Sequence, residues 1–329
     1  MDWSKRLPRI RAAAVWAVVG FVAVYAVIGV LVDGGRLGGH ALPELRHPWL
    51  LLLVFTLAPA NYGLRFIKWH AYTRRLGFSQ VPWRGNLVVF VSGLGLTVTP
   101  GKVGELVKSW MLWDRYEVPA ARSAPMIFAD RVTDGCAMLA LASLGALWLG
   151  RGQPPYLLMA AIVVLILLVR SRTVMLAAVR LLSRLRPLRG MQARLHDLVD
   201  AARTLLALDM FLLAFGLGVV GWGLEGLIVA LVLRAFAFPF SIGGSLLVVA
   251  SSAIAGGVSA LPGGVGAAEG VMVALLLWLR VPLPLAVLAT LITRVSTLWL
   301  GVAIGLVCLG VAEGRRPVRG AMRHEPAPG

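Results

Sequence analysis

Three charged residues interrupt an apolar stretch of the sequence, TVTPGKVGELVKSW (residues 97–110). Lys102, Glu105 and Lys108 follow at steps of three, so a helix would place them on roughly one face. The stretch also holds three residues that end one helix and let another begin: Pro100, Gly101 and Gly104. The N-terminus of the second helix would present free N–H groups and a positive dipole end, which suit a phosphate. A simple helix kink with a lysine that reaches the aqueous surface is the alternative for this motif alone.

A second charged group follows in the sequence ADRVTD, where Asp130 and Asp134 lie one helical turn apart with Arg131 between them. Arg294 lies in a similar apolar context near the C-terminus. Charged side chains inside apolar segments normally face one another or a water-filled cavity. Two interpretations remain open: a salt-bridge cluster that locks the helices together, and a pathway for a lipid or an ion.

The sequence contains an internal repeat that links these groups. LPGGVGAAE (residues 261–269) shares a P-G-x-V-G core with TPGKVGE, and TRVST aligns with DRVTD, which matches Arg294 to Arg131. The second motif contributes four further candidate residues: Pro262, Gly263, Gly266 and Glu269. Two matches in register indicate a duplication, and inverted duplications with broken helices are typical of secondary transporters.

The elements that must position these residues are membrane helices. Of the 329 residues, 59% are hydrophobic and 14% are charged, and the mean hydropathy is +0.83. Residues 12–32 carry no charge over a length that spans a bilayer. Cys136 and Cys308 lie far apart in apolar runs, without the spacing of a disulfide or a metal site. The composition predicts an all-α polytopic membrane protein.

The net charge of +17 comes from basic residues between the apolar runs, as the positive-inside rule predicts for cytoplasmic loops. If both glycine-rich segments crossed the membrane, the arginine-rich linker would lie outside, against that rule. We therefore expect about six full spans and two re-entrant segments, with both termini in the cytoplasm. The first re-entrant segment would enter from the cytoplasm and the second from outside. The expected topology identifies lipid, rather than nucleic acid, as the partner of the basic residues.

The expected organisation has four parts. Residues 1–169 form the first membrane half, with a re-entrant segment at 85–113. Residues 170–209 form a basic amphipathic linker in the cytoplasm. Residues 210–311 form the second half, with a re-entrant segment at 241–279, and 312–329 form a basic tail.

Three further polar residues lie inside expected spans. Glu225 is a lone carboxylate, for which a buried partner of an arginine and a functional role are equally supported. Asn61 and Arg65 lie one turn apart on the span from Pro48, and Arg65 either has a buried role or reaches the cytoplasmic surface.

The combination of TPGKVGELVKSWML, DRVTD and LPGGVGAAEGVMVALLL resembles the flippase-like family, the transmembrane region of lysylphosphatidylglycerol synthases and its stand-alone relatives. The resemblance covers about residues 11–311. It implies a helical bundle with re-entrant elements that moves lipids with polar head groups between leaflets. It also implies that the two P-G motifs, with Asp130 and Arg131, form the site. Lys102 stands where the family often has arginine. Lysine keeps the positive charge but cannot donate the two parallel hydrogen bonds that a guanidinium group makes to a phosphate or carboxylate.

The resemblance and the residues together favour an integral inner-membrane lipid translocase of a bacterial cell, which moves an anionic or polar-head lipid passively or with an ion. A phosphate-bearing or polyprenyl-phosphate-like lipid is the expected ligand, and an enzyme of lipid biosynthesis is left open as a partner. We expect no enzymatic activity, no cofactor and no metal, because the spans hold no metal cluster or nucleophile–base pair and the sequence lacks an ATP-binding loop. The alternatives are an ion-coupled transporter of small solutes and a non-transporting membrane partner of a hopanoid or glycolipid pathway.

Overall fold

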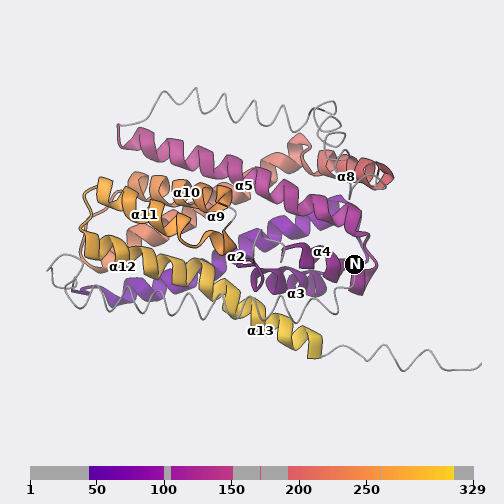
Figure 1. Ribbon diagram of the computed structural model, residues 1–329, viewed down its shortest axis with the longest axis horizontal. Coiled ribbons are helices and arrows are strands. Elements are labelled where there is room, and N and C mark those ends of the chain that lie inside the picture. Colours follow the sequence, from indigo (N-terminus) through magenta and orange to yellow (C-terminus); the bar gives the residue numbers. More distant parts are fainter. Residues whose placement is uncertain (1–43, 100–104, 151–170, 172–191, 260, 315–329) are drawn as a thin grey trace, which may run out of the picture.

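The computed structural model describes residues 44–99, 105–150, 171, 192–259 and 261–314 (Figure 1). The expected span at 12–32 and the apolar run at 157–169 lie outside these ranges. So do Pro100, Gly101, Lys102 and Gly104 of the first motif, most of the basic linker, and the tail from 315. The described part of the chain is helical throughout and contains no strand.

The first series of helices begins with α2 (Pro48–Arg75), which has a proline in its first turn and ends before Gly77 at φ 78°. A short helix α3 (Trp83–Leu94) follows Pro82, and α4 (Leu106–Tyr116) ends at Glu117 in the left-handed conformation. The long helix α5 (Ala120–Trp148) starts directly after Pro119. Proline suits helix starts because its missing N–H has no partner there.

The second series repeats this order of one long helix, two short helices and one long helix. Its elements are α9 (Leu208–Ala235), α10 (Ile242–Val258), η3 (Pro262–Gly264), α11 (Ala267–Trp278), α12 (Leu283–Arg294), η4 (Val295–Trp299) and α13 (Leu300–Gly314). Helices α12, η4 and α13 continue one another, and η4 is a π-helical turn directly after Arg294. The helices α2 and α9 have 28 residues each.

The helices α2 and α9 pack against each other in opposite directions. At one end the backbone N–H of His47 donates to the carbonyl of Ala235 at 2.9 Å. At the other end Arg75 and Asp209 form an exposed ion pair at 2.9 Å. Antiparallel packing therefore brings the polar residues in the middle of the two helices to one level.

The two pairs of short helices form hairpins at opposite ends of the bundle, α3 and α4 at one end and α10 and α11 at the other (Figure 1). Their tips meet in the middle: a Cβ atom built on Gly263 would lie 3.0 Å from Val98 Cγ1. Gly95 and Gly305 also touch through their backbones, where α3 ends beside α13. Side chains larger than hydrogen would separate these elements.

In the part of the chain that the structure describes, three helices are long and apolar enough to cross a membrane: Pro48–Arg75, Leu208–Ala235 and Leu283–Ala312. Helix α5 has 29 residues but carries the charged ADRVTD sequence, and the hairpin of α10 and α11 consists of shorter apolar helices. Large apolar side chains are exposed on the long helices, including Leu52, Trp148 and Val307 at 72%, 68% and 68%. A hydrocarbon environment accounts for these side chains, because monomeric soluble proteins rarely expose large apolar patches.

The described end of the basic linker is α8 (Gln192–Leu205), which packs against α5. Ala201, Leu205 and Leu206 join the same apolar cluster as side chains of α2, α3 and α5. This face of the helix therefore belongs to the core of the bundle.

Candidate functional site

A fully buried lysine holds two carboxylates of α5 together. Lys68 Nζ on α2 donates to Oδ1 of Asp134 at 2.5 Å and lies 2.6 Å from Oδ1 of Asp130. The Lys68 side chain is 1% exposed. Because Asp130 and Asp134 are one helical turn apart, one ammonium group can reach both carboxylates. Removing a charge from such a buried set leaves its partners uncompensated.

Arg65 continues this network toward the second half of the chain. Its guanidinium donates to Oδ2 of Asp134 at 2.7 Å and lies 4.9 Å from the ring centre of Trp222 on α9. One turn earlier on α2, Asn61 Nδ2 donates to Oε1 of Glu225 at 2.7 Å. Arg65 is therefore a half-buried network residue that is held between Asp134 and Trp222.

The two P-G motifs make the same type of ion pair. Arg131 on α5 donates to Glu105 Oε1 at 2.6 Å, and Arg294 Nε donates to Glu269 Oε1 at 2.6 Å. The glutamate precedes the arginine by 26 residues in the first pair and by 25 in the second. Each hairpin is thus tied to the long helix that follows it.

The second tip has an additional anchor. Arg294 also donates to the carbonyl of Gly263 at 2.9 Å, while Glu269 accepts from the backbone N–H of Gly266 at 2.7 Å. Gly263, Gly264 and Gly266 all have positive φ, between 61° and 90°, which L-residues with a side chain rarely adopt. The glycines allow the tight turn, and the Arg294–Glu269 ion pair stabilises it through hydrogen bonds to its backbone at Gly263 and Gly266.

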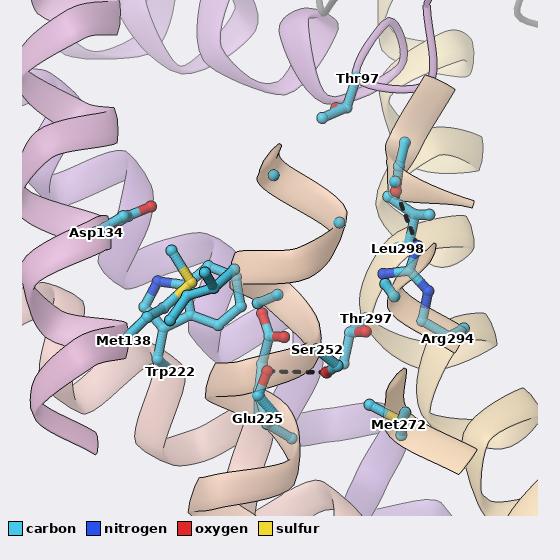
Figure 2. A pocket seen from close by; sticks show the side chains of 18 of the residues that line it. Thr97, Asp134, Met138, Trp222, Glu225, Ser252, Met272, Arg294, Thr297 and Leu298 are labelled. Atoms are coloured by element: carbon cyan, nitrogen blue, oxygen red, sulfur yellow. Dashed lines mark hydrogen bonds between the residues drawn. The ribbon is translucent and has the colours of Figure 1, made fainter. Parts of the chain in front are cut away.

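A cavity of about 530 Å³ lies where the two tips meet (Figure 2). Figure 2 shows Asp134 on one wall, Arg294 on the opposite wall and Thr97 of the first tip at one end. Among the residues that the structure describes, its charged lining residues are Arg65, Arg131, Asp134, Glu225 and Arg294. Trp222, Met138 and Met272 add apolar surface. The described lining of the cavity therefore combines three guanidinium groups, two carboxylates and an apolar side.

The structure brings some predicted site residues to the cavity and places others behind it. Arg131, Asp134, Arg294 and Gly263 line the cavity among the described residues. Glu105 and Glu269 do not line the cavity but pair with the lining residues Arg131 and Arg294, and Asp130 pairs with the buried Lys68. Pro262 and Gly266 shape the second tip, and Lys102 lies outside the described residues.

Lys108 is buried outside the cavity wall. Its ammonium group lies over the rings of Trp69 and Phe90, at 4.5 Å and 5.7 Å from their centres. Cation–π attraction compensates part of the cost of burying this charge. The spacing predicted that Glu105 and Lys108 share one helical face at the site; both are buried, but Lys108 faces the aromatic residues of α2 and α3 instead of the cavity.

Sequence reasoning missed Lys68, because it singled out only Asn61 and Arg65 on the span from Pro48. Helix α2 continues to Arg75, and Lys68 lies inside the bundle. The available signal was the spacing of Asn61, Arg65 and Lys68 at i, i+4 and i+7, which puts all three on one helical face.

A comparison with protein families gives a match over residues 5–305 to the family described as lysylphosphatidylglycerol synthase TM region. The chain belongs to this family. No curated protein and no solved structure matches the chain. The family match covers both P-G motifs and both arginine helices, so the resemblance inferred from those motifs is confirmed. Together with the apolar helices, membership identifies the chain as a multi-pass membrane protein with a lipid-related role.

Proposed function

We propose that this protein is a lipid translocase of the bacterial cytoplasmic membrane, which moves a lipid with an anionic head group between leaflets. The observation that carries the proposal is the cavity between the hairpin tips, into which Arg65, Arg131 and Arg294 all reach. Guanidinium groups bind phosphate well because their planar donors match its oxygens. The phosphate of a lipid head group is therefore the ligand that fits this wall best.

Arg131 is the guanidinium most available to a ligand. Its side chain is 38% exposed, and its Nε, although buried, donates to none of the described residues. Arg294 is 15% exposed, and its Nε and one terminal nitrogen are already engaged. We propose that Arg131 makes the first contact with the phosphate and that Arg294 completes the site from the opposite hairpin.

The cavity also has an apolar opening, which favours a lipid over a small water-soluble substrate. Gly257 and Val258 at the end of α10 line it, and the Val258 side chain is 81% exposed. An apolar side chain at the mouth suits contact with hydrocarbon. The head group would enter the cavity there while the acyl or prenyl chains stay in the bilayer.

The two hairpins supply a route for alternating access. We propose that they enter the membrane from opposite faces, as expected from the repeat, because their tips meet and their open ends lie at opposite ends of the bundle (Figure 1). Helices α2 and α9 run antiparallel, as such an inverted arrangement requires. Small shifts of one hairpin against the other would then open the site to one leaflet at a time.

Lipid exchange in liposomes tests the proposal. Purified protein is reconstituted with fluorescent phosphatidic acid or a polyprenyl-phosphate probe, and a membrane-impermeant quencher reports the outer leaflet. We expect lipid exchange to be at least about tenfold faster than in protein-free liposomes, which corresponds to a decrease of about 1.4 kcal/mol in the activation free energy.

The paired variants Arg131→Gln/Glu105→Gln and Arg294→Gln/Glu269→Gln should abolish this exchange. Each replaces an ion pair by two neutral amides, so no buried charge is left alone. The matched control is Arg75→Gln/Asp209→Asn, which removes an exposed ion pair far from the cavity. No exchange with the native protein for any probe would instead favour the solute transporter or the non-transporting membrane partner.

A further inference from the structure

Glu225 differs from the other carboxylates at the centre of the bundle because its partner is not a cation. It accepts a hydrogen bond from the neutral amide of Asn61 at 2.7 Å. In the ranges that the structure describes, no basic side chain lies within ion-pair distance of it. The other four carboxylates each lie 2.5 or 2.6 Å from a lysine or an arginine: Glu105, Asp130, Asp134 and Glu269.

Glu225 and Arg65 line the same cavity but do not form an ion pair. Glu225 follows Arg65 by 160 positions, the same distance that separates Leu208 and Pro48, the first residues of α9 and α2. The two side chains therefore occupy equivalent places on antiparallel helices and line one cavity. Arg65, however, donates to Asp134 rather than to Glu225.

The charges around Glu225 otherwise balance. The charged or titratable groups that face it are Tyr62 and Arg65 of α2, Asp134 of α5 and Arg294 of α12. The wall formed by α10 and α11 presents neutral side chains, including Ser252 and Met272. Among the residues that the structure describes, the ion-paired sets that reach the cavity each sum to zero: Arg65 and Lys68 with Asp130 and Asp134, Arg131 with Glu105, and Arg294 with Glu269. An ionised Glu225 thus adds one negative charge that no cation of these sets offsets, and a protonated Glu225 adds none.

We propose that Glu225 is a proton-binding site that couples the movement of an anionic head group to a proton gradient. This inference rests on the proposed function and names its driving ion. The proton passes from water in the cavity to one carboxylate oxygen of Glu225, while Asn61 keeps its hydrogen bond to the other. It returns to water when the cavity opens to the opposite face, and no other bond changes.

Electrostatics link the proton to the lipid. An anionic head group at Arg131 and Arg294 is repelled by an ionised Glu225 and is not repelled by a protonated one. Because linkage is reciprocal, protonation strengthens lipid binding as much as lipid binding strengthens protonation. Binding of the head group should therefore strengthen as the pH falls, by up to about tenfold per pH unit for one linked proton. The two species move together, in the same direction.

A pH gradient across proteoliposomes tests the coupling. With native protein and fluorescent phosphatidic acid, we expect the lipid to accumulate in the leaflet on the more alkaline side, toward which the protons flow. The Glu225→Gln protein mimics the protonated state, so it should still exchange the lipid but should leave it evenly distributed. The control is Glu44→Gln, which neutralises an exposed carboxylate outside the bundle.

The outcomes of this experiment separate the coupling from the proposed function. Absence of exchange by the native protein, with or without a gradient, would refute the translocase itself. If the protein exchanges the lipid but the lipid stays equally distributed between the two leaflets under a pH gradient, only the role of the proton is refuted. Accumulation of the lipid driven by a sodium gradient at equal pH would refute that role as well.

An infrared difference spectrum gives a readout independent of transport. Adding short-chain ether-linked phosphatidic acid, which has no ester carbonyl of its own, to the detergent-solubilised native protein at a fixed pH should increase the C=O band of a protonated carboxyl group. The same addition should leave the Glu225→Gln spectrum without that band and the Glu44→Gln spectrum with it. A band that persists in Glu225→Gln would assign the proton to another carboxylate and overturn the inference.

Discussion

Arg294 and Glu269 form an ion pair at 2.6 Å that joins the last long helix to the tip of the hairpin before it. The same arginine donates to the Gly263 carbonyl, and the same glutamate accepts from the Gly266 N–H. A single pair of side chains therefore fixes both the backbone of the turn and its place against α12. Any ligand that draws Arg294 away would loosen the tip at the same time.

Replacing Arg294 by lysine should impair transport although the charge is kept. A lysine ammonium cannot present the planar set of donors that contacts Glu269 and Gly263 together. Loss of one hydrogen bond to a charged group costs about 1.5–3 kcal/mol, so we expect exchange to fall by about tenfold or more. Leaflet exchange of the Arg294→Lys protein measures this, with Arg280→Lys at an exposed turn as the control. Native-like exchange by Arg294→Lys would mean that charge alone suffices.

Lys68 should be the most sensitive position for stability in the network. The Lys68→Met substitution removes the ammonium that holds Asp130 and Asp134, and breaking a buried pair costs about 3–5 kcal/mol. Thermal unfolding in detergent would show a large loss of stability. The exposed pair of Arg75 and Asp209 provides the contrast, because Arg75→Met should cost less than about 1 kcal/mol. Equal effects of the two substitutions would contradict the buried network.

The contact between Gly95 and Gly305 predicts opposite effects for two glycine substitutions in helices. A Cβ on Gly305 would collide with the backbone of Gly95, so Gly305→Ala should separate α13 from α3 and destabilise the protein by about 1–3 kcal/mol. Gly270 in α11 faces open space, and Gly270→Ala should be neutral or stabilising by up to about 1 kcal/mol. Unfolding temperatures of the two variants test this directly. Two equally tolerated alanines would show that α3 and α13 are not in close contact.

Tyr62 should stabilise the π-helical turn that follows Arg294. Its hydroxyl donates to the carbonyls of Thr297 at 2.9 Å and Ser296 at 3.2 Å. Loss of a partner for buried carbonyl groups costs about 1–3 kcal/mol, so Tyr62→Phe should loosen η4. Hydrogen exchange measured by mass spectrometry should rise in peptides that cover 295–299 and stay unchanged in α10. Unchanged exchange in both regions would show that the turn holds without Tyr62.

The inverted arrangement predicts that the open ends of the two hairpins face opposite sides of the membrane. The native Cys136 and Cys308 are removed, and a single cysteine is introduced either at Glu117 or at Pro282, which are both exposed. A membrane-impermeant reagent should reach Glu117→Cys from the cytoplasmic side and Pro282→Cys from outside. Labelling of both from the same side would refute the topology and the alternating access built on it.

The sequence by itself determined the helical class and the family, and within the described residues it also indicated the break in the second hairpin. Residues 241–279 were expected as one broken segment, and the structure has two short helices between 242 and 278 on either side of the P-G turn. The second half was expected to extend to residue 311, and the structure has a continuous series of helices there, from Leu283 to Gly314. These features are local: apolar length, proline at helix starts and glycine at positive φ decide them within a few residues.

Only the tertiary structure decided which charged side chains pair with each other. Periodicity places Arg65 and Lys68 on one face of α2, but the crossing with α5 and α9 selects Asp134 as the partner of Arg65 and leaves Glu225 to Asn61. Equally, spacing could not show that Lys108 lies against aromatic rings while Arg131 reaches the cavity. Pairing between residues far apart in the chain depends on the angles and distances at which helices pack, which the sequence pattern of each helix does not contain.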